Sequence, residues 1–209
     1  MLFDVPAIVP LALSAWQTLF TSEPPANGDR PQTAFPGHQL LKLNDGSSLP
    51  SPAFGVGSVH KFENVTDLVL SAFANGYRVV DDAPFYANEE TTGLAIAASG
   101  IAREALYVSS KWDGLHGQNV RKEIEASLEK LGTNYLDGLY VHFPQLATNL
   151  TDIWRQFEDV LDEGLTRTIS VSNFNETVLA GLLEHARYKP AVNQVRASLL
   201  SSSMSQAGR

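Results

Sequence analysis

Hydrophobic positions follow two alternating patterns along the chain from about residue 40. Segments whose apolar side chains recur every three to four residues predict amphipathic helices at 65–73, 93–98, 120–131, 153–161 and 178–183. Short β-prone apolar runs between them predict strands at 53–56, 79–80, 106–108, 136–141, 168–171 and 191–195. Strands separated by helices indicate a parallel sheet, because a parallel connection needs a crossover of that length.

A β-hairpin is predicted before these units, because Asn44-Asp45-Gly46 tolerates the positive φ angles of a tight turn between two short apolar runs. A doubly wound sheet would need a third glycine after Gly55-Val56-Gly57 to bind a dinucleotide phosphate, and the sequence has none there. The pattern therefore favours an α/β fold of the (β/α)8 TIM-barrel type. It is predicted to be incomplete, with about six β/α units, since 209 residues fall short of the roughly 250 that are usual.

The first 37 residues differ from the rest. Residues 5–20 are mostly apolar but contain two prolines, and they are fewer than the ~20 that a membrane-spanning helix needs. They also lack the basic start and the cleavage pattern of a secretory signal. We predict an apolar, Pro-rich segment and linker over 1–37, a partial barrel over 38–195 and a divergent tail over 196–209. The expected location is cytoplasmic, without membrane contact, and a secreted or anchored protein is the less favoured alternative.

Composition excludes several classes of function. The net charge of −8 opposes binding to nucleic acid, whose affinity for proteins comes from Lys and Arg on phosphates. No cysteine is present, so disulfides, thiolate metal sites and a cysteine nucleophile are excluded, and no metal site is predicted. Three Asn-x-Thr sequons, at Asn64, Asn149 and Asn175, are interpreted as helix caps.

Polar residues follow several predicted strands directly. Asp81, Lys111, His142 and the pair Ser172-Asn173 occupy such positions, and Tyr86 lies five residues after Asp81. In a barrel, reactive groups project from the carboxyl ends of different strands, so these side chains are candidates for one site. Each has a plainer interpretation, as a turn residue, a surface charge or a half-buried aromatic. Ser172-Asn173 in particular could cap the following helix.

The segment from Asp81 to Glu89, followed by Gly93-Leu94-Ala95-Ile96, resembles the Asp-x-Ala-x-x-Tyr-x-Asn-Glu signature of the aldo-keto reductase family. The resemblance covers about residues 39–195. Further matches follow in the family's order, at Arg103-Glu104, Val108-Ser109-Ser110-Lys111, Ser127-Leu128 to Leu131, Tyr135-Leu136-Asp137, His142-Phe143-Pro144, Trp154 to Gly164, Val171-Ser172-Asn173-Phe174 and Asn193-Gln194.

The resemblance implies reduction of aldehydes or ketones to alcohols by hydride transfer from NADPH, with a small carbonyl compound as substrate. Tyr86 would be the general acid, and a nearby cation must tune its pKa of about 10 for work near neutral pH. Lys111 would stabilise the tyrosinate, Asp81 would hold Lys111, and His142 would orient the substrate oxygen.

The resemblance also implies where the cofactor and substrate bind. Ser172, Asn173 and Gln194 would hydrogen-bond the nicotinamide carboxamide and so select which face of the ring presents its hydride. Gln194 could instead satisfy its amide inside the barrel. Phe143 and Trp112 would form apolar walls for the substrate.

The sequence departs from the family at several single positions, Asp82 among them, and again after Val195. Asp82 stands where Thr is common and could draw Lys111 away from Asp81 or raise a neighbouring pKa. After Val195 the family's last two strands and its basic region for the 2′-phosphate are not recognisable, which predicts a truncated member. We expect open edge strands, self-association, poor solubility and weak NADPH binding. A catalytically silent regulatory or binding protein on this scaffold is the alternative function.

Overall fold

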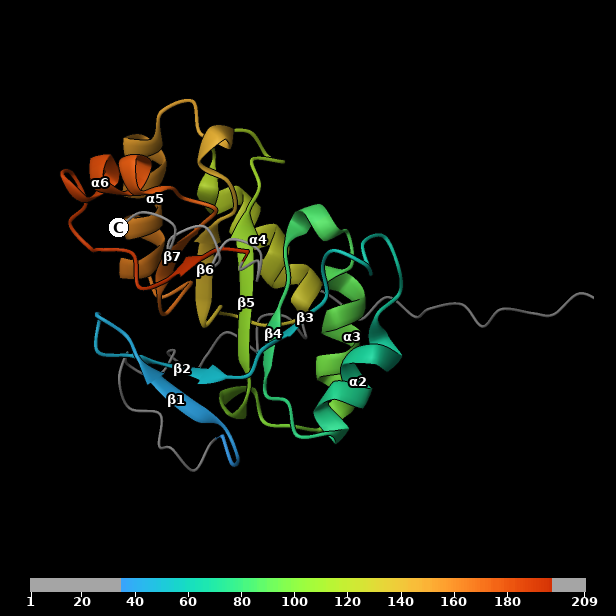
Figure 1. Ribbon diagram of the computed structural model, residues 1–209. Helices are drawn as coiled ribbons and strands as arrows, with labels where there is room; N and C mark the ends of the chain where they lie inside the picture. Colours follow the sequence, from blue (N-terminus) through green and yellow to red (C-terminus); the bar gives the residue numbers. More distant parts are fainter. Residues whose placement is uncertain (1–34, 197–209) are drawn as a thin grey trace, which may run out of the picture.

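The structure, a computed structural model, describes residues 35–196 (Figure 1). Most of the predicted linker over 1–37 and nearly all of the predicted tail over 196–209 lie outside the described residues. Within the linker, Phe35 is buried and packs with Val79, Tyr107, Leu40 and Leu49.

Two sheets are present among residues 35–196. A two-stranded antiparallel hairpin comprises β1 (Gln39–Lys42) and β2 (Ser48–Ser51), as the sequence predicts. A six-stranded sheet has its strands in chain order and every neighbouring pair parallel. Its members are β3 (Phe54–Gly55), β4 (Val79–Asp81), β5 (Tyr107–Trp112), β6 (Gly138–Val141), β7 (Ile169–Ser172) and β8 (Asn193–Gln194).

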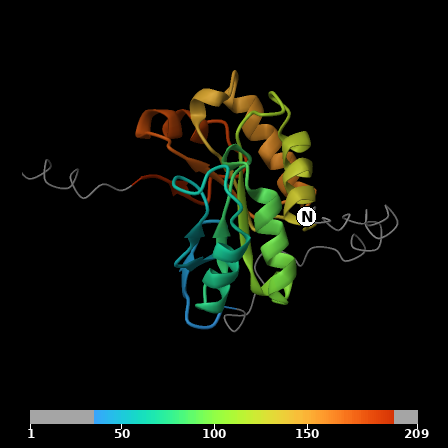
Figure 2. The ribbon, with the colours of Figure 1, turned by 90° about the vertical axis from the view of Figure 1, so that its right-hand side faces the viewer.

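A helix follows each strand from β3 to β7, which confirms the predicted β/α units. The helices are α2 (Thr66–Ala74), α3 (Glu89–Ser99), α4 (Val120–Leu131), α5 (Leu150–Asp162) and α6 (Glu176–Leu183). Consecutive helices contact one another and lie along the outside of the sheet, with α3 and α4 side by side (Figure 2).

Local sequence accounts for the helix ends. The Asn149 and Asn175 side chains accept backbone N–H groups in the first turns of α5 and α6, and Asn64 accepts the N–H of Thr66. Asn149 and Asn175 are therefore helix caps, as predicted, whereas Asn64 precedes the N-cap residue Val65 and α2 has no side-chain cap bond. Because Asn175 caps α6, the interpretation of Ser172-Asn173 as the cap is wrong.

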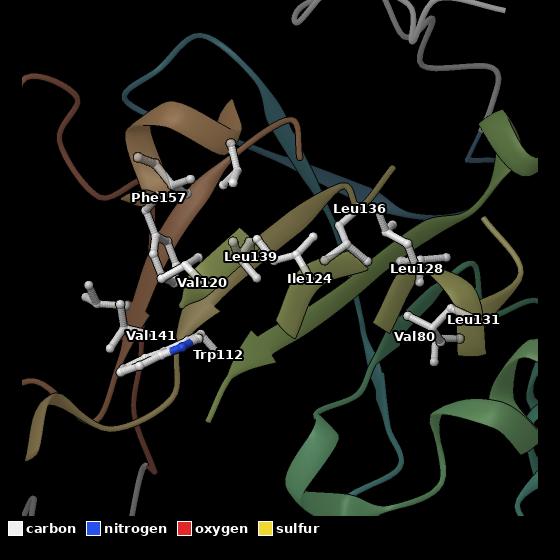
Figure 3. Packing of buried hydrophobic residues seen from close by; sticks show 14 of the residues in the cluster. Val80, Trp112, Val120, Ile124, Leu128, Leu131, Leu136, Leu139, Val141 and Phe157 are labelled. Atoms are coloured by element: carbon white, nitrogen blue, oxygen red, sulfur yellow. The ribbon is translucent and has the colours of Figure 1, made fainter. Parts of the chain in front are cut away.

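The core lies between the strands and the helices. Trp112 and Val141, partners on β5 and β6, pack near Val120 and Ile124 of α4 (Figure 3). The amphipathic period predicts most inward positions correctly, but Leu183 at the end of α6 is 40% exposed.

Strand β5 is longer than the predicted run at 106–108. Ser109, Ser110 and Lys111 belong to it and are buried, although they are polar. The hydropathy pattern predicts that the strand ends at Val108, whereas the backbone continues to pair with β6 as far as Trp112. Lys111 is consequently inside the strand rather than after it.

Candidate active site

The polar residues selected from the sequence lie at the same edge of the sheet. Asp81, Ser172 and Gln194 are the last residues of β4, β7 and β8, and His142 directly follows β6. Parallel strands present their carboxyl ends together, so side chains far apart in the sequence meet there. The bond between Gln194 Nε2 and Asp81 Oδ2, 3.1 Å long, joins residues 113 positions apart.

Asp81 and Lys111 form a buried ion pair at this edge. Lys111 Nζ lies 2.8 Å from each carboxylate oxygen of Asp81 and donates a further bond of 2.9 Å to the carbonyl of Asp82. Ser109 Oγ donates to Asp81 Oδ1 at 2.9 Å. Lys111 is only 2% exposed, so the pair is held in one geometry.

The charge state of Lys111 follows from two opposing effects. Burial alone lowers the pKa of the ammonium, because a buried charge is poorly solvated. Asp81 acts against burial and, together with the smaller contributions of Tyr86 and Asp82, raises the pKa of Lys111 above its ordinary value. Lys111 is therefore a fixed cation across the physiological pH range.

Tyr86 lies next to this pair, at the end of the 3₁₀ turn η2 (Pro84–Tyr86). Lys111 Nζ is 5.3 Å from the centre of the Tyr86 ring. Gly57 also packs against the Tyr86 ring. A Cβ atom at position 57 would lie only 2.5 Å from Tyr86 Cζ, which is too close for a larger residue. Glycine at position 57 is thus a requirement of the tyrosine's position, a role that the sequence pattern does not reveal.

The pKa of Tyr86 departs from the sequence expectation. Burial raises it, Lys111 lowers it, and Asp81 raises it again, with a net increase above the ordinary value. Lys111 acts in the expected direction, but burial outweighs it in this structure. Tyr86 therefore remains a protonated phenol at neutral pH, the form that a proton donor needs.

His142 is the fourth member of this group. Its ring meets that of Tyr86 edge to face, with centroids 5.6 Å apart, and stacks on Phe143 at 4.4 Å. Its Nδ1 is hydrogen-bonded to Oδ1 of Asp113, a buried carboxylate that the sequence analysis does not single out. Asp113 is the first residue after β5, so the rule of strand ends would have selected it had the length of β5 been known.

Ser172, Asn173 and Gln194 form a cluster at the ends of β7 and β8. Ser172 Oγ donates to the Gln194 carbonyl at 2.8 Å, and Asn173 Nδ2 lies 3.0 Å from both Ser172 Oγ and the carbonyl of His142. Asn173 has a φ of +60°, which places its amide at this edge instead of at the start of α6.

The two predicted substrate walls differ in position. Phe143 is half-buried and lies on the ring of His142. Trp112 is 0% exposed and belongs to the core beneath the helices. Successive side chains of a strand point to opposite faces, so Trp112 points away from the side that Lys111 occupies. Trp112 therefore offers no surface to a substrate here, and its predicted role as a wall is corrected.

Asp82 does not compete for Lys111. Its carboxylate accepts the N–H of Ala83 at 2.7 Å and the hydroxyl of Thr92 at 2.6 Å, and only its backbone carbonyl contacts Lys111. Burial raises the pKa of Asp82 to about 7. The predicted diversion of Lys111 is absent, whereas the predicted effect on a neighbouring pKa is present, because Asp82 contributes to the raised pKa of Lys111.

Residues 35–196 contain neither a cluster of metal-ligating side chains nor a helix suited to span a membrane. No group of three or more His, Asp or Glu side chains is placed to hold a metal ion. No helix in this part of the chain has the length and apolar character to cross a bilayer.

The fold and the site together define a protein of the (β/α)-barrel type with a Tyr, Lys, Asp and His group at the strand ends. Residues 53–208 match the sequence model of the aldo/keto reductase family. The chain belongs to this family.

Curated relatives agree with the family assignment. The glyoxal reductase of Bacillus subtilis is 40% identical over 157 residues, covering 74% of this chain and 56% of the relative. The 2,5-diketo-D-gluconic acid reductase B of a Corynebacterium species is 37% identical over 164 residues, covering 77% and 59%. The chain thus spans less than two thirds of the length of these relatives.

Solved structures share the fold. An aldo/keto reductase from Brucella melitensis superposes with a TM-score of 0.70 at 34% identity, covering 77% of this chain and 63% of that one. The Bombyx mori aldo-keto reductase in complex with NADP gives a TM-score of 0.69 at 32% identity, covering 76% and 58%. The six-stranded sheet therefore corresponds to part of the family's barrel.

Proposed function

We propose that this chain carries the reactive centre of an NADPH-dependent reductase of aldehydes or ketones, with Tyr86 as the proton donor. The observation that carries the proposal is the group formed by Tyr86, Lys111, Asp81 and His142 at a single edge of the sheet. The family consists of oxidoreductases that act on carbonyl compounds, as the names of the relatives indicate.

The chemistry follows from these residues. A bound nicotinamide would supply the hydride that reaches the carbonyl carbon. Tyr86 gives its phenolic proton to the carbonyl oxygen, which completes the alcohol and leaves a tyrosinate. The fixed positive charge of Lys111 stabilises that tyrosinate, and Asp81 holds Lys111 at the required place. Proton return from solvent restores the phenol.

The amide cluster fits a carboxamide. Asn173 Oδ1 and Gln194 Oε1 accept no hydrogen bond from any residue within 35–196, whereas the corresponding amide nitrogens are engaged. A nicotinamide carboxamide presents N–H donors, so these oxygens and the Ser172 hydroxyl are suited to hold it. The Bombyx mori structure, in complex with NADP, supports the same class of cofactor.

The experiment compares Tyr86→Phe with the unaltered full chain in an assay of NADPH oxidation with glyoxal and simple aldehydes. We expect the variant to lose roughly 100-fold or more in kcat, because the proton donor is removed. Tyr77→Phe is the matched control, since Tyr77 packs against Phe54 away from the strand-end group, and it should keep the full rate.

Two outcomes would count against the proposal. Equal rates for Tyr86→Phe and the unaltered chain would remove Tyr86 from the mechanism. Binding of NADPH without its oxidation by any carbonyl compound would favour the alternative of a catalytically silent binding protein. Cytoplasmic location and self-association through strand edges stay predictions.

A further inference from the structure

Asp113 is anchored on both sides at the rim of the site. Its side chain is 3% exposed. Oδ2 accepts the backbone N–H of Phe85 at 2.9 Å, while its own backbone N–H donates to Glu123 Oε1 at 2.5 Å. Glu123 belongs to α4 and also accepts the N–H of His116. These hydrogen bonds hold Asp113 in place independently of His142. Its other carboxylate oxygen, Oδ1, makes the hydrogen bond to His142 Nδ1.

That contact determines which nitrogen of His142 carries hydrogen. An ionised carboxylate only accepts hydrogen bonds, so Nδ1 of His142 must be protonated to bind Asp113. In the neutral ring, Nε2 is then an acceptor with a lone pair. Nε2 becomes a donor only when the ring is the imidazolium cation.

Packing around the His142 ring restricts its rotation, so Nδ1 and Nε2 cannot readily exchange positions. Phe143 stacks on one face, Tyr86 and Phe85 meet the ring edge to face, and the His142 backbone is held from β5 and from Asn173. Within residues 35–196, no hydrogen bond is made by Nε2, so this nitrogen is the one left for a ligand.

We propose that Asp113 is a positioning residue, which fixes His142 with Nδ1 protonated and directs Nε2 to the substrate oxygen as an imidazolium donor. The first part stands on geometry alone, and the second rests on the proposed carbonyl reductase function. The ionisable groups around the ring are Asp113 on the loop after β5, Tyr86 on η2, Lys111 on β5 beside Tyr86, Lys61 over Phe85, and Glu123 behind Asp113.

The test reads the His142 ring directly by two-bond nitrogen–hydrogen NMR correlation on the ¹⁵N-labelled full chain. His142→Gln identifies the signal among the five histidines. We expect Nδ1–H in the unaltered chain and a shift toward Nε2–H in Asp113→Leu, where the acceptor is gone. Asp159→Asn, an exposed carboxylate change on α5, is the control and should leave the ring unchanged.

Asp113→Asn keeps the shape of the side chain and serves if the leucine variant does not fold. Its amide oxygen can still accept from Nδ1, so Nδ1–H persists, but loss of the negative charge disfavours the imidazolium. In the carbonyl assay, kcat should fall about tenfold or more with little change in KM.

The outcomes separate this proposal from the proposed function. An Nε2–H ring in the unaltered chain, or an Nδ1–H ring that persists in Asp113→Leu, overturns the role of Asp113. Because the spectra need no turnover, a chain without reductase activity would still show the predicted Nδ1–H signal if Asp113 acts as we infer.

Discussion

Two regions of the strand-end edge are built differently. On β4 and β5, Asp81 receives hydrogen bonds on both oxygens, and the Lys111 ammonium donates to Asp81 and to the carbonyl of Asp82. On β7 and β8, Asn173 and Gln194 keep side-chain oxygens that accept no bond from the described part of the chain. The first region is complete without a ligand, whereas the second retains acceptors that a ligand can use.

This difference separates two tasks. A centre that stabilises charge works best when its dipoles and ions are already fixed, because no reorganisation is then needed during the reaction. A binding cluster needs unsatisfied groups to recognise its ligand. Variants of the charged pair should therefore affect folding strongly, and variants of the amide cluster should affect it less.

The largest effect is expected for Lys111→Met. The change leaves the partly buried Asp81 carboxylate without its charged partner, which should reduce the free energy of unfolding by about 3 kcal/mol. Urea denaturation of the full chain measures this value. Lys122→Met, at an exposed position of α4, is the control and should change it by no more than about 0.5 kcal/mol. A loss for Lys111→Met no larger than the control's would show that the pair does not stabilise the fold.

Asn173→Ala should have an intermediate effect of about 2–3 kcal/mol. It removes two side-chain hydrogen bonds from a residue at φ +60°. Alanine is also less favourable than asparagine in this left-handed region, because it has no polar side chain to hydrogen-bond locally. Asn173→Gly removes the same bonds without the steric cost, so it should be more stable than the alanine variant by about 1 kcal/mol. Equal stability of the two variants would contradict the strained conformation.

The smallest effect is expected for Asp82→Asn, and it depends on pH. The folded pKa of Asp82 is about 7, above the ordinary value of 3.8 for an aspartate, so the folded chain binds the proton more tightly. Stability is therefore lost as pH rises from about 4 to about 7. The asparagine variant avoids this loss, but its NH2 group cannot accept the Thr92 hydroxyl as the carboxylate does. The net gain over the unaltered chain should therefore be only about 1–2 kcal/mol at pH 8, with no gain at pH 4. Thermal unfolding at the two pH values measures it, and a gain independent of pH would refute the assignment.

Much of the fold can be predicted from the sequence because it depends on local signals. The hairpin at Asn44-Asp45-Gly46, the six parallel strands with five helices between them, and the caps at Asn149 and Asn175 all rest on residues within a few positions of one another. The extent of β5 could not be predicted, since Lys111 and the serines before it are polar and yet buried. Their burial is compensated by partners from other strands, which hydropathy does not register.

The residues of the site divide in the same way, into those that the local sequence reveals and those that only tertiary contacts reveal. Tyr86, Lys111, Asp81 and His142 are recognisable as a set because they lie near strand ends and match a family signature. Other contributions come from contacts between distant segments. Asp113 meets a histidine 29 positions away, and Gly57 is required only because the Tyr86 ring lies over it. The misplacement of Trp112 follows from the shortened β5, since strand alternation over its full length would have turned the indole toward the helices.

The bond from Gln194 to Asp81 has a mechanical consequence. It links β8, an edge of the described sheet, to β4 across the three strands between them. The Asp81 carboxylate that holds the Lys111 ammonium therefore also helps to fix the curvature of the sheet. A ligand bound through Gln194 Oε1 leaves this bond in place, whereas a ligand that displaces Gln194 Nε2 breaks it. Displacement of Gln194 Nε2 by a ligand at β8 would therefore change the charge environment of the Tyr86 phenol, because Asp81 and Lys111 lie beside it.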